Sequence, residues 1–189
     1  MNNQKNYANS YIDKIYEMLG SIFKEGIKRE IISKNPLLNV LKPKSTKQDK
    51  KIDALSIEEQ KAFIEALKGE PYKNIFLIAI HSGMRIGEIL ALTSADIDFD
   101  NKLIHITNTL TKDRNGKVKI GGTTKTYEST RDIPITSILE PILKDCIANY
   151  VSNNNDLLFC QSNKTIIAPS TINIHFKKIC KNANIKVII

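Results

Sequence analysis

The chain has 189 residues, a hydrophobic share of 41% and a formal net charge of +8. This length holds one ordinary domain or one domain and part of another, and the hydrophobic share excludes a disordered tail. No apolar run approaches the length of a membrane span, and the first residues are polar, so neither a membrane protein nor a secreted one is expected. Three widely spaced cysteines predict buried free thiols in a reducing cytoplasm, not a disulfide frame or a metal site.

The positive charge is concentrated in three blocks. Lysine and arginine outnumber aspartate and glutamate by 6 to 1 over residues 34–51, by 7 to 2 over 101–131 and by 5 to 0 over 161–189. Blocks of this kind favour a polyanion that lies across several segments, although solvated surfaces also produce them. Charge alone therefore leaves nucleic-acid binding as one of two interpretations.

The first part of the chain predicts a helical segment and then a linker. Apolar residues at helical spacing predict an amphipathic helix within residues 9–32, and two prolines bracket a short helical turn near residues 35–43. One and a half helices cannot bury a core, so this part is an appendage or the remnant of a larger helical module. Residues 42–53 are polar and basic, and they are the candidate domain boundary.

Five further helices are predicted after this boundary. Ser56 and Glu59 match a capping box that opens the first, and a buried helix over residues 72–82 ends at Gly83. The third helix spans Arg85–Leu92. A second capping box at Ser137 and Glu140 opens a helix to about Val151, and the last helix begins at Pro169.

Residues 102–135 predict a small three-stranded antiparallel sheet. Apolar and polar residues alternate from residue 103 in the first strand, and Lys117–Ile120 and Arg131–Ile135 form the other two. The last strand contains a proline and is therefore an edge strand. Asn115-Gly116 is typical of a hairpin turn. The predicted fold class is α+β, mostly helical with this one small sheet.

Arg85 lies between the apolar run Ile75–Ile80 and the apolar residues that follow it. An unpaired guanidinium is costly to bury there. Glu88 follows one helical turn later and can hold one side of the guanidinium, while the other donors meet a second anion such as a phosphate. The same spacing also fits an internal ion pair that only closes a helical turn.

Two segments resemble motifs of the tyrosine recombinases, the phage and conjugative-transposon integrases. His81–Asp98, with the sequence HSGMRIGEILALTSADID, resembles the first arginine motif of this family. Thr123–Ile135, with the sequence TTKTYESTRDIPI, resembles the β-hairpin that presents the family's catalytic lysine. The order and spacing of the two motifs agree with the family, whose catalytic domain combines helices with such a hairpin.

The resemblance also implies a domain organisation. The first helix, Asn35-Pro36 and Lys42–Lys44 are similar to the end of the family's core-binding domain and its linker. Residues 1–43 are then the end of a helical DNA-binding domain, residues 44–54 a linker and residues 55–189 a partial catalytic domain, incomplete at its C-terminus.

The chemistry that the resemblance implies is DNA strand cleavage and rejoining for integration or excision of a phage or mobile element. A tyrosine attacks a phosphodiester and forms a 3′-phosphotyrosyl link, with no metal or other cofactor. Arg85 would bind the non-bridging phosphate oxygens, and Lys125 would protonate the leaving 5′ oxygen. Glu88 would support Arg85 without touching DNA.

The implied partners are double-stranded DNA at attachment sites and, in the full-length protein, other recombinase protomers. Candidate contacts to the DNA backbone are Lys112, Thr124, Thr126 and Arg131, although a solvated role fits Lys112 and Arg131 equally well.

The sequence departs from the family in its last part. The family continues with a His-x-x-Arg box, a further His or Trp and the nucleophilic tyrosine, and the chain ends at Ile189 where that box should begin. His175 has no arginine three residues on, and none of the six tyrosines is placed as a nucleophile. We therefore expect an enzyme as the parent protein, and no cutting or joining of DNA by these residues alone.

Two alternatives stay open. The chain is a non-catalytic DNA-binding remnant or regulator derived from an integrase, or a helical regulator whose arginine motif is coincidental. A fold without a hairpin between its helices would favour the second.

Overall fold

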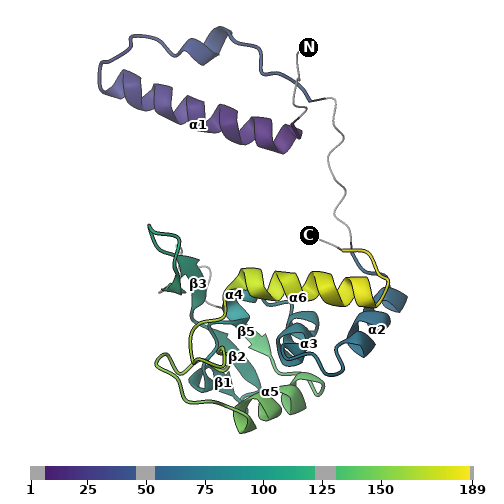
Figure 1. The fold of residues 1–189 in the computed structure, drawn as a ribbon. Coiled ribbons are helices and arrows are strands. Elements are labelled where there is room, and N and C mark those ends of the chain that lie inside the picture. The colour runs from purple at the N-terminus through teal and green to yellow at the C-terminus, as the bar shows by residue number, and fades with distance from the viewer. Residues whose placement is uncertain (1–6, 46–53, 122–130, 188–189) are drawn as a thin grey trace. The chain divides into compact units, whose positions relative to one another are not determined.

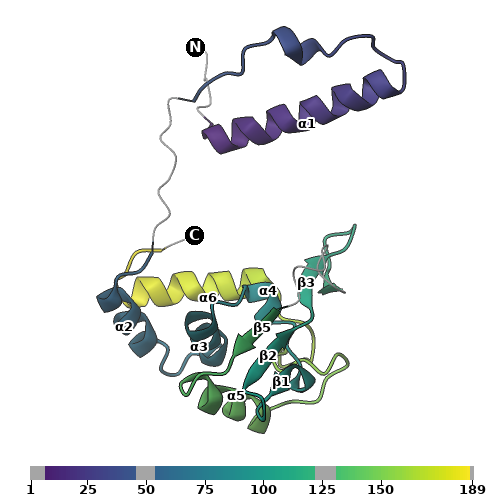
Figure 2. The same ribbon diagram turned by 180° about the vertical axis from the view of Figure 1, so that it is seen from behind.

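The computed structural model describes residues 7–45, 54–121 and 131–187. Contacts divide the chain into two compact units, Met1–Ala54 (unit 1) and Leu55–Ile189 (unit 2). Figures 1 and 2 show the elements of each unit from opposite sides. Within the three described ranges, no helix is both long and apolar enough to cross a membrane.

Unit 1 is built on one amphipathic helix, α1 (Asn9–Lys28), and a short 3-10 turn, η1 (Pro36–Asn39). The Tyr16 hydroxyl, on α1, donates to the carbonyl of Val40 at 2.6 Å and so ties the helix to the segment after the turn. None of the unit's described residues is buried, and Ile31 is 74% exposed. The prediction that one and a half helices cannot bury a core is confirmed.

Unit 2 is organised around α3 (Lys73–Ser82), an apolar helix. It packs against α5 (Leu139–Ala148), while α2 (Ile57–Ala66) packs against α6 (Pro169–Asn182). Figure 1 shows α3 between α5 and α6. The fully buried core side chains come from all of these helices and from the sheet, and they include Phe63, Leu67, Ile75, Ile78, Ile89, Ile104, Leu139, Leu143 and Ile179.

One of the two predicted capping boxes is present. The Ser56 hydroxyl accepts from the Glu59 N–H at 3.2 Å, and the Glu59 carboxylate accepts from the Ser56 N–H at 2.7 Å. The second box, at Ser137 and Glu140, is wrong. Ile135 is buried at the end of the last strand, so Thr136 is the first residue free to turn, and its hydroxyl accepts from the N–H of Leu139 at 3.3 Å. Helix α5 begins at Leu139, and its N-cap residue, Ile138, makes no side-chain cap hydrogen bond.

The strands form two sheets, not one. A three-stranded antiparallel sheet has the order β1 (Ile97–Asp98), β2 (Leu103–Ile106), β5 (Arg131–Pro134), and a separate two-stranded ribbon joins β3 (Thr109–Lys112) to β4 (Val118–Gly121). The predicted α+β class is confirmed, and a three-stranded antiparallel sheet with β5 at an edge is present, although only two of its strands are among the three predicted ones. The predicted strand at Lys117–Ile120 belongs to the ribbon instead, because β1 and β5 occupy both edges of β2.

The ribbon is a hairpin closed by the predicted turn. Gly116 has a φ of 79°, which glycine adopts at low cost, and the Asp113 carboxylate accepts from the N–H groups of Asn115 and Lys117 at 2.8 and 2.9 Å. Figures 1 and 2 show the ribbon projecting from the body of unit 2. A helical regulator without such a hairpin does not fit this fold.

A buried carboxylate fixes the turn before the sheet. Asp96, in η2 (Ser94–Asp96), is 8% exposed. It accepts from the N–H and the hydroxyl of Thr93 at 2.8 and 2.7 Å and from the hydroxyl of Thr107 at 2.7 Å. Because Thr107 directly follows β2, these bonds join the two ends of the three-stranded sheet's first hairpin.

Replacing Asp96 with alanine is expected to lower the free energy of unfolding by about 2 kcal/mol, because the N–H and hydroxyl of the partly buried Thr93 and the hydroxyl of the exposed Thr107 lose a buried acceptor. Asp100→Ala is the matched control, because Asp100 is exposed and its loss should change stability by less than about 0.5 kcal/mol. Urea denaturation followed by circular dichroism measures both. Equal stability losses for the two variants would contradict this account of the turn.

Candidate functional site

The turn between α3 and α4 brings Arg85 to the surface of unit 2. Gly83 ends α3 with a φ of 66°, a left-handed conformation that favours glycine. Met84 is then buried, and Arg85 lies in an extended conformation immediately before α4 (Ile86–Ile89). The Arg85 side chain is 76% exposed, so most of its guanidinium faces solvent.

Glu88 is the buried carboxylate of the site, with 3% exposure. Its Oε2 accepts from the backbone N–H of Arg85 at 2.8 Å, and its Oε1 accepts from Arg85 Nη1 at 3.0 Å. Arg131 Nη1 and Nη2 donate to the same two oxygens at 3.0 and 2.8 Å. One carboxylate is thus shared by two guanidiniums and an amide, and we call the three residues the Arg85–Glu88–Arg131 cluster.

The electrostatics of the cluster keep its carboxylate ionised. Burial alone would raise the pKa of Glu88, but hydrogen bonds from Arg131 and from the backbone and side chain of Arg85 outweigh it and hold that pKa below its ordinary value. The hydrogen bond with Glu88 in turn raises the pKa of Arg131. Two positive charges and one negative charge leave a surplus of one positive charge, which suits an anion.

The two arginines of the cluster are held differently. Arg131 opens β5 opposite Ile106 and uses both terminal nitrogens on Glu88, with 36% of its side chain exposed. Arg85 uses only Nη1, and no group in the described part of the chain accepts from its Nε or Nη2. The Arg85–Glu88 ion pair that the spacing predicts is therefore present, and it leaves part of Arg85 free.

Helix α4 is a single turn, shorter than the predicted Arg85–Leu92. Leu90, Ala91 and Leu92 are all buried, and the Leu92 carbonyl accepts from the N–H of Leu158 at 2.8 Å. The chain leaves the helix to make this contact with a later segment. A helix of one turn contributes little dipole, so the side-chain charges of the cluster dominate its electrostatics.

The β3–β4 ribbon packs against α4 and adds positive charge on that side of unit 2. A Cβ atom at Gly87 would lie 2.8 Å from Oγ1 of Thr109, so the approach of α4 to the ribbon depends on glycine. Four basic side chains of the ribbon are exposed and form no ion pair with the residues that the structure describes: Lys112, Arg114, Lys117 and Lys119.

The structure brings together only some of the predicted site residues. The cluster contains three of them, and Lys112 is exposed on the ribbon. Lys125, with Thr124 and Thr126, lies outside the described residues. The pairing of Arg131 with Glu88 was not predicted from the sequence, in which the only signal for it is an arginine at the start of the predicted last strand.

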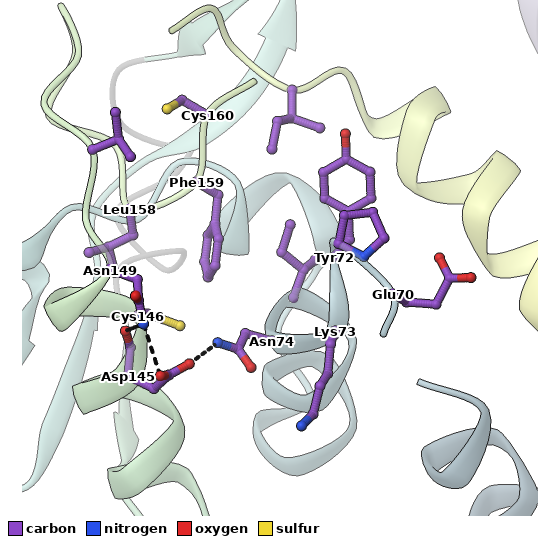
Figure 3. A pocket seen from close by; sticks show the side chains of 14 residues that line it. Glu70, Tyr72, Lys73, Asn74, Asp145, Cys146, Asn149, Leu158, Phe159 and Cys160 are labelled. Atoms are coloured by element: carbon purple, nitrogen blue, oxygen red, sulfur yellow. Dashed lines mark hydrogen bonds between the residues drawn. The ribbon is translucent and has the colours of Figure 1, made fainter. Parts of the chain in front are cut away.

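A separate cavity of about 390 Å³ lies beside α3 and α5 (Figure 3). Its charged lining residues are Glu70, Asp145 and Lys73, which leave it with a negative balance. Asn74 points toward Asp145 and donates to it at 2.7 Å, and burial raises the pKa of the Cys146 thiol to about 11. This cavity is poorly suited to a polyanion. In the described ranges no three His, Cys, Asp or Glu side chains are grouped as a metal site.

A solvent-facing arginine backed by a buried carboxylate, on an α+β unit with a basic ribbon, is an arrangement that suits an anion. Residues 52–188 match the model of the phage integrase family. This match covers most of the chain, and the chain belongs to that family.

Two relatives show how much of a complete protein the chain spans. The tyrosine recombinase XerC-like protein of Caldanaerobacter subterraneus is 31% identical over 153 residues, which are 75% of this chain and 39% of that protein. The ICEBs1 integrase of Bacillus subtilis is 33% identical over 93 residues, which are 48% of this chain and 25% of that protein. The chain therefore spans less than half of the length of either relative.

Solved structures share the fold. The Tn1549 transposon integrase, in complex with a circular intermediate DNA, aligns with a TM-score of 0.82 and 20% identity over 96% of this chain and 60% of that one. A lambda integrase tetramer bound to a Holliday junction aligns with a TM-score of 0.62 and 15% identity over 95% of this chain and 52% of that one. The predicted recombinase fold is confirmed.

Proposed function

We propose that this chain is the phosphate-binding part of a site-specific DNA recombinase. The observation that carries the proposal is the Arg85 guanidinium, which is held through one nitrogen by the buried Glu88 and is otherwise exposed. Membership of the phage integrase family supports it, as do relatives of the same fold solved with DNA. The proposed partners are double-stranded DNA at attachment sites and further recombinase protomers, in the cytoplasm.

The proposed reaction begins when a tyrosine hydroxyl loses its proton to solvent and attacks the phosphorus of a DNA phosphodiester. A tyrosine–phosphorus bond forms as the bond to the 5′ oxygen breaks, which leaves a 3′-phosphotyrosyl link and a 5′ hydroxyl. The free donors of Arg85 stabilise the charge that develops on the non-bridging oxygens. Lys125 supplies the proton to the leaving 5′ oxygen. The reverse reaction with a second strand end rejoins the DNA, and the outcome is integration or excision of a phage or mobile element.

We also propose that these 189 residues bind DNA without cleaving it. The sequence contains no His-x-x-Arg segment. Two of the described tyrosine hydroxyls have roles in the fold, since Tyr16 donates to Val40 and Tyr150 donates to the carboxylate of Asp156 at 3.0 Å. A non-catalytic regulator that occupies attachment sites would bind DNA through the same surface as a recombinase fragment. Incubation of the chain with a nicked attachment-site duplex tests for cleavage, and we expect no covalent adduct between protein and DNA.

Salt-dependent binding is the expected behaviour of the full chain toward a fluorescently labelled duplex. With about three phosphate contacts, affinity measured by anisotropy should fall roughly 40-fold between about 50 and about 200 mM salt, with little sequence preference. Arg85→Ala should weaken binding by about tenfold at low salt, and Lys125→Ala should weaken it as well.

Lys144→Ala is the matched control for the charge change. Lys144 is an exposed cation that pairs with Glu140 at 2.7 Å on α5, and its removal should change affinity by less than about twofold. Affinity independent of salt, or equal losses in Arg85→Ala and Lys144→Ala, would rule out phosphate binding by this site.

A further inference from the structure

We propose that Arg131 is a positioning residue that keeps Arg85 available to a phosphate, and that it does not itself contact DNA. The inference rests on the proposed function of Arg85. It replaces the backbone contact that the sequence predicts for Arg131 with an action through Glu88.

The geometry commits Arg131 to Glu88. Its two terminal nitrogens donate to the two carboxylate oxygens at 3.0 and 2.8 Å, in the parallel arrangement that a guanidinium and a carboxylate form best. Arg85 donates one side-chain hydrogen bond to the same carboxylate at 3.0 Å. The side chain with more hydrogen bonds to Glu88 is also the less exposed one, at 36% for Arg131 against 76% for Arg85.

The charges explain why this division matters for an anion. With both arginines in place, Arg131 compensates the buried Glu88, and the charge of Arg85 is the surplus that faces solvent. Without Arg131, Arg85 is the remaining side-chain partner of a carboxylate that is 3% exposed. An incompletely compensated buried carboxylate draws its remaining cation inward. The net charge of the cluster then falls to zero, and the donors of Arg85 are no longer free for a phosphate.

If Arg131 acts only through Arg85, the effects of the two arginines on DNA affinity are non-additive. Arg131→Ala should weaken the binding of the full chain to a labelled duplex by about tenfold, as Arg85→Ala does. The double variant Arg85→Ala/Arg131→Ala should bind within about twofold of Arg85→Ala alone, because both changes remove the same contact.

Neutralising Glu88 provides the decisive arm of the experiment. In Arg131→Ala/Glu88→Gln the carboxylate charge is gone, so Arg85 is released, and affinity should return to within about threefold of the unsubstituted chain. Lys144→Ala/Glu140→Gln, at an exposed ion pair on α5, is the control for a general gain in affinity from removing a negative charge.

Each possible result supports or overturns the inference. A direct DNA contact by Arg131 predicts roughly hundredfold weaker binding in the double arginine variant and no recovery with Glu88→Gln. A purely structural ion pair predicts unchanged affinity with reduced thermal stability. If Arg131→Ala is unfolded at the assay temperature, Arg131→Gln, whose amide can still donate to Glu88 without a charge, is expected to show the same loss and recovery. Equal affinity of the unsubstituted chain and Arg85→Ala would instead overturn the proposed function.

Discussion

Replacing Glu88 with alanine is expected to lower the free energy of unfolding by about 3 kcal/mol at neutral pH. The change leaves Arg131 partly buried without its two acceptors and removes the acceptor for the backbone N–H of Arg85. Breaking a fully buried ion pair costs more, about 3–5 kcal/mol, but both arginines of this cluster reach solvent. Urea denaturation of the full chain, followed by circular dichroism, measures the loss.

The control for Glu88 is an exposed ion pair. Glu65 pairs with Lys68 on the surface of unit 2, where both side chains are at least 70% exposed. Because solvent screens such pairs, Glu65→Ala should lower stability by less than about 0.5 kcal/mol. If Glu88→Ala lowers stability as little as Glu65→Ala does, Glu88 does not hold the cluster together.

A second test of the same cluster compares the stability of the unsubstituted chain with that of Glu88→Gln as a function of pH. Folding lowers the pKa of Glu88, so its ionised form contributes stability that is fully present above the ordinary value of 4.5 and is lost as the pH falls through the lowered pKa. The stability difference between the unsubstituted chain and Glu88→Gln should therefore narrow below pH 4.5. A difference that is constant from neutral to acidic pH would contradict this account.

Replacing Phe63 with alanine is expected to lower the free energy of unfolding by about 4 kcal/mol. Phe63 is the buried side chain of α2, and its ring lies edge-on to Phe76 of α3 at 5.7 Å and 5.5 Å from Phe176 of α6. The substitution removes a contact common to three helices. Ile57→Ala, on the same helix but at a side chain that is 67% exposed, should cost less than about 0.5 kcal/mol. A loss below about 1 kcal/mol in Phe63→Ala would mean that α2 is held elsewhere.

Features set by neighbouring residues could be predicted from the sequence. The ion pair of Arg85 with Glu88 joins residues three apart, and Gly83 ends α3 in the left-handed conformation that its position after an apolar run predicts. The hairpin turn at Asn115-Gly116 is also local. In each case a few consecutive residues contain both the donor and the acceptor, or the glycine that the backbone requires.

Features that depend on distant segments could not be predicted. Arg131 reaches Glu88 across 43 positions, and it does so because β5 pairs with β2 in a register that places Arg131 opposite Ile106. The strand at Lys117–Ile120 was assigned to the wrong sheet because periodicity identifies a strand but not its partner. Helix α4 is followed by a buried segment in which the Leu92 carbonyl accepts from the N–H of Leu158, a residue far along the chain.

The most direct test of the account is an NMR titration of the arginine side chains of the full, nitrogen-15-labelled chain with a short DNA duplex. Arg85→Lys and Arg131→Lys assign the two signals. We predict that the Nε–H signal of Arg85 shifts as DNA is added and that salt reverses the shift. The Nε–H signal of Arg131 should not shift, because the Arg131 side chain stays paired with Glu88. A shift confined to Arg131, with Arg85 unaffected, would contradict the account.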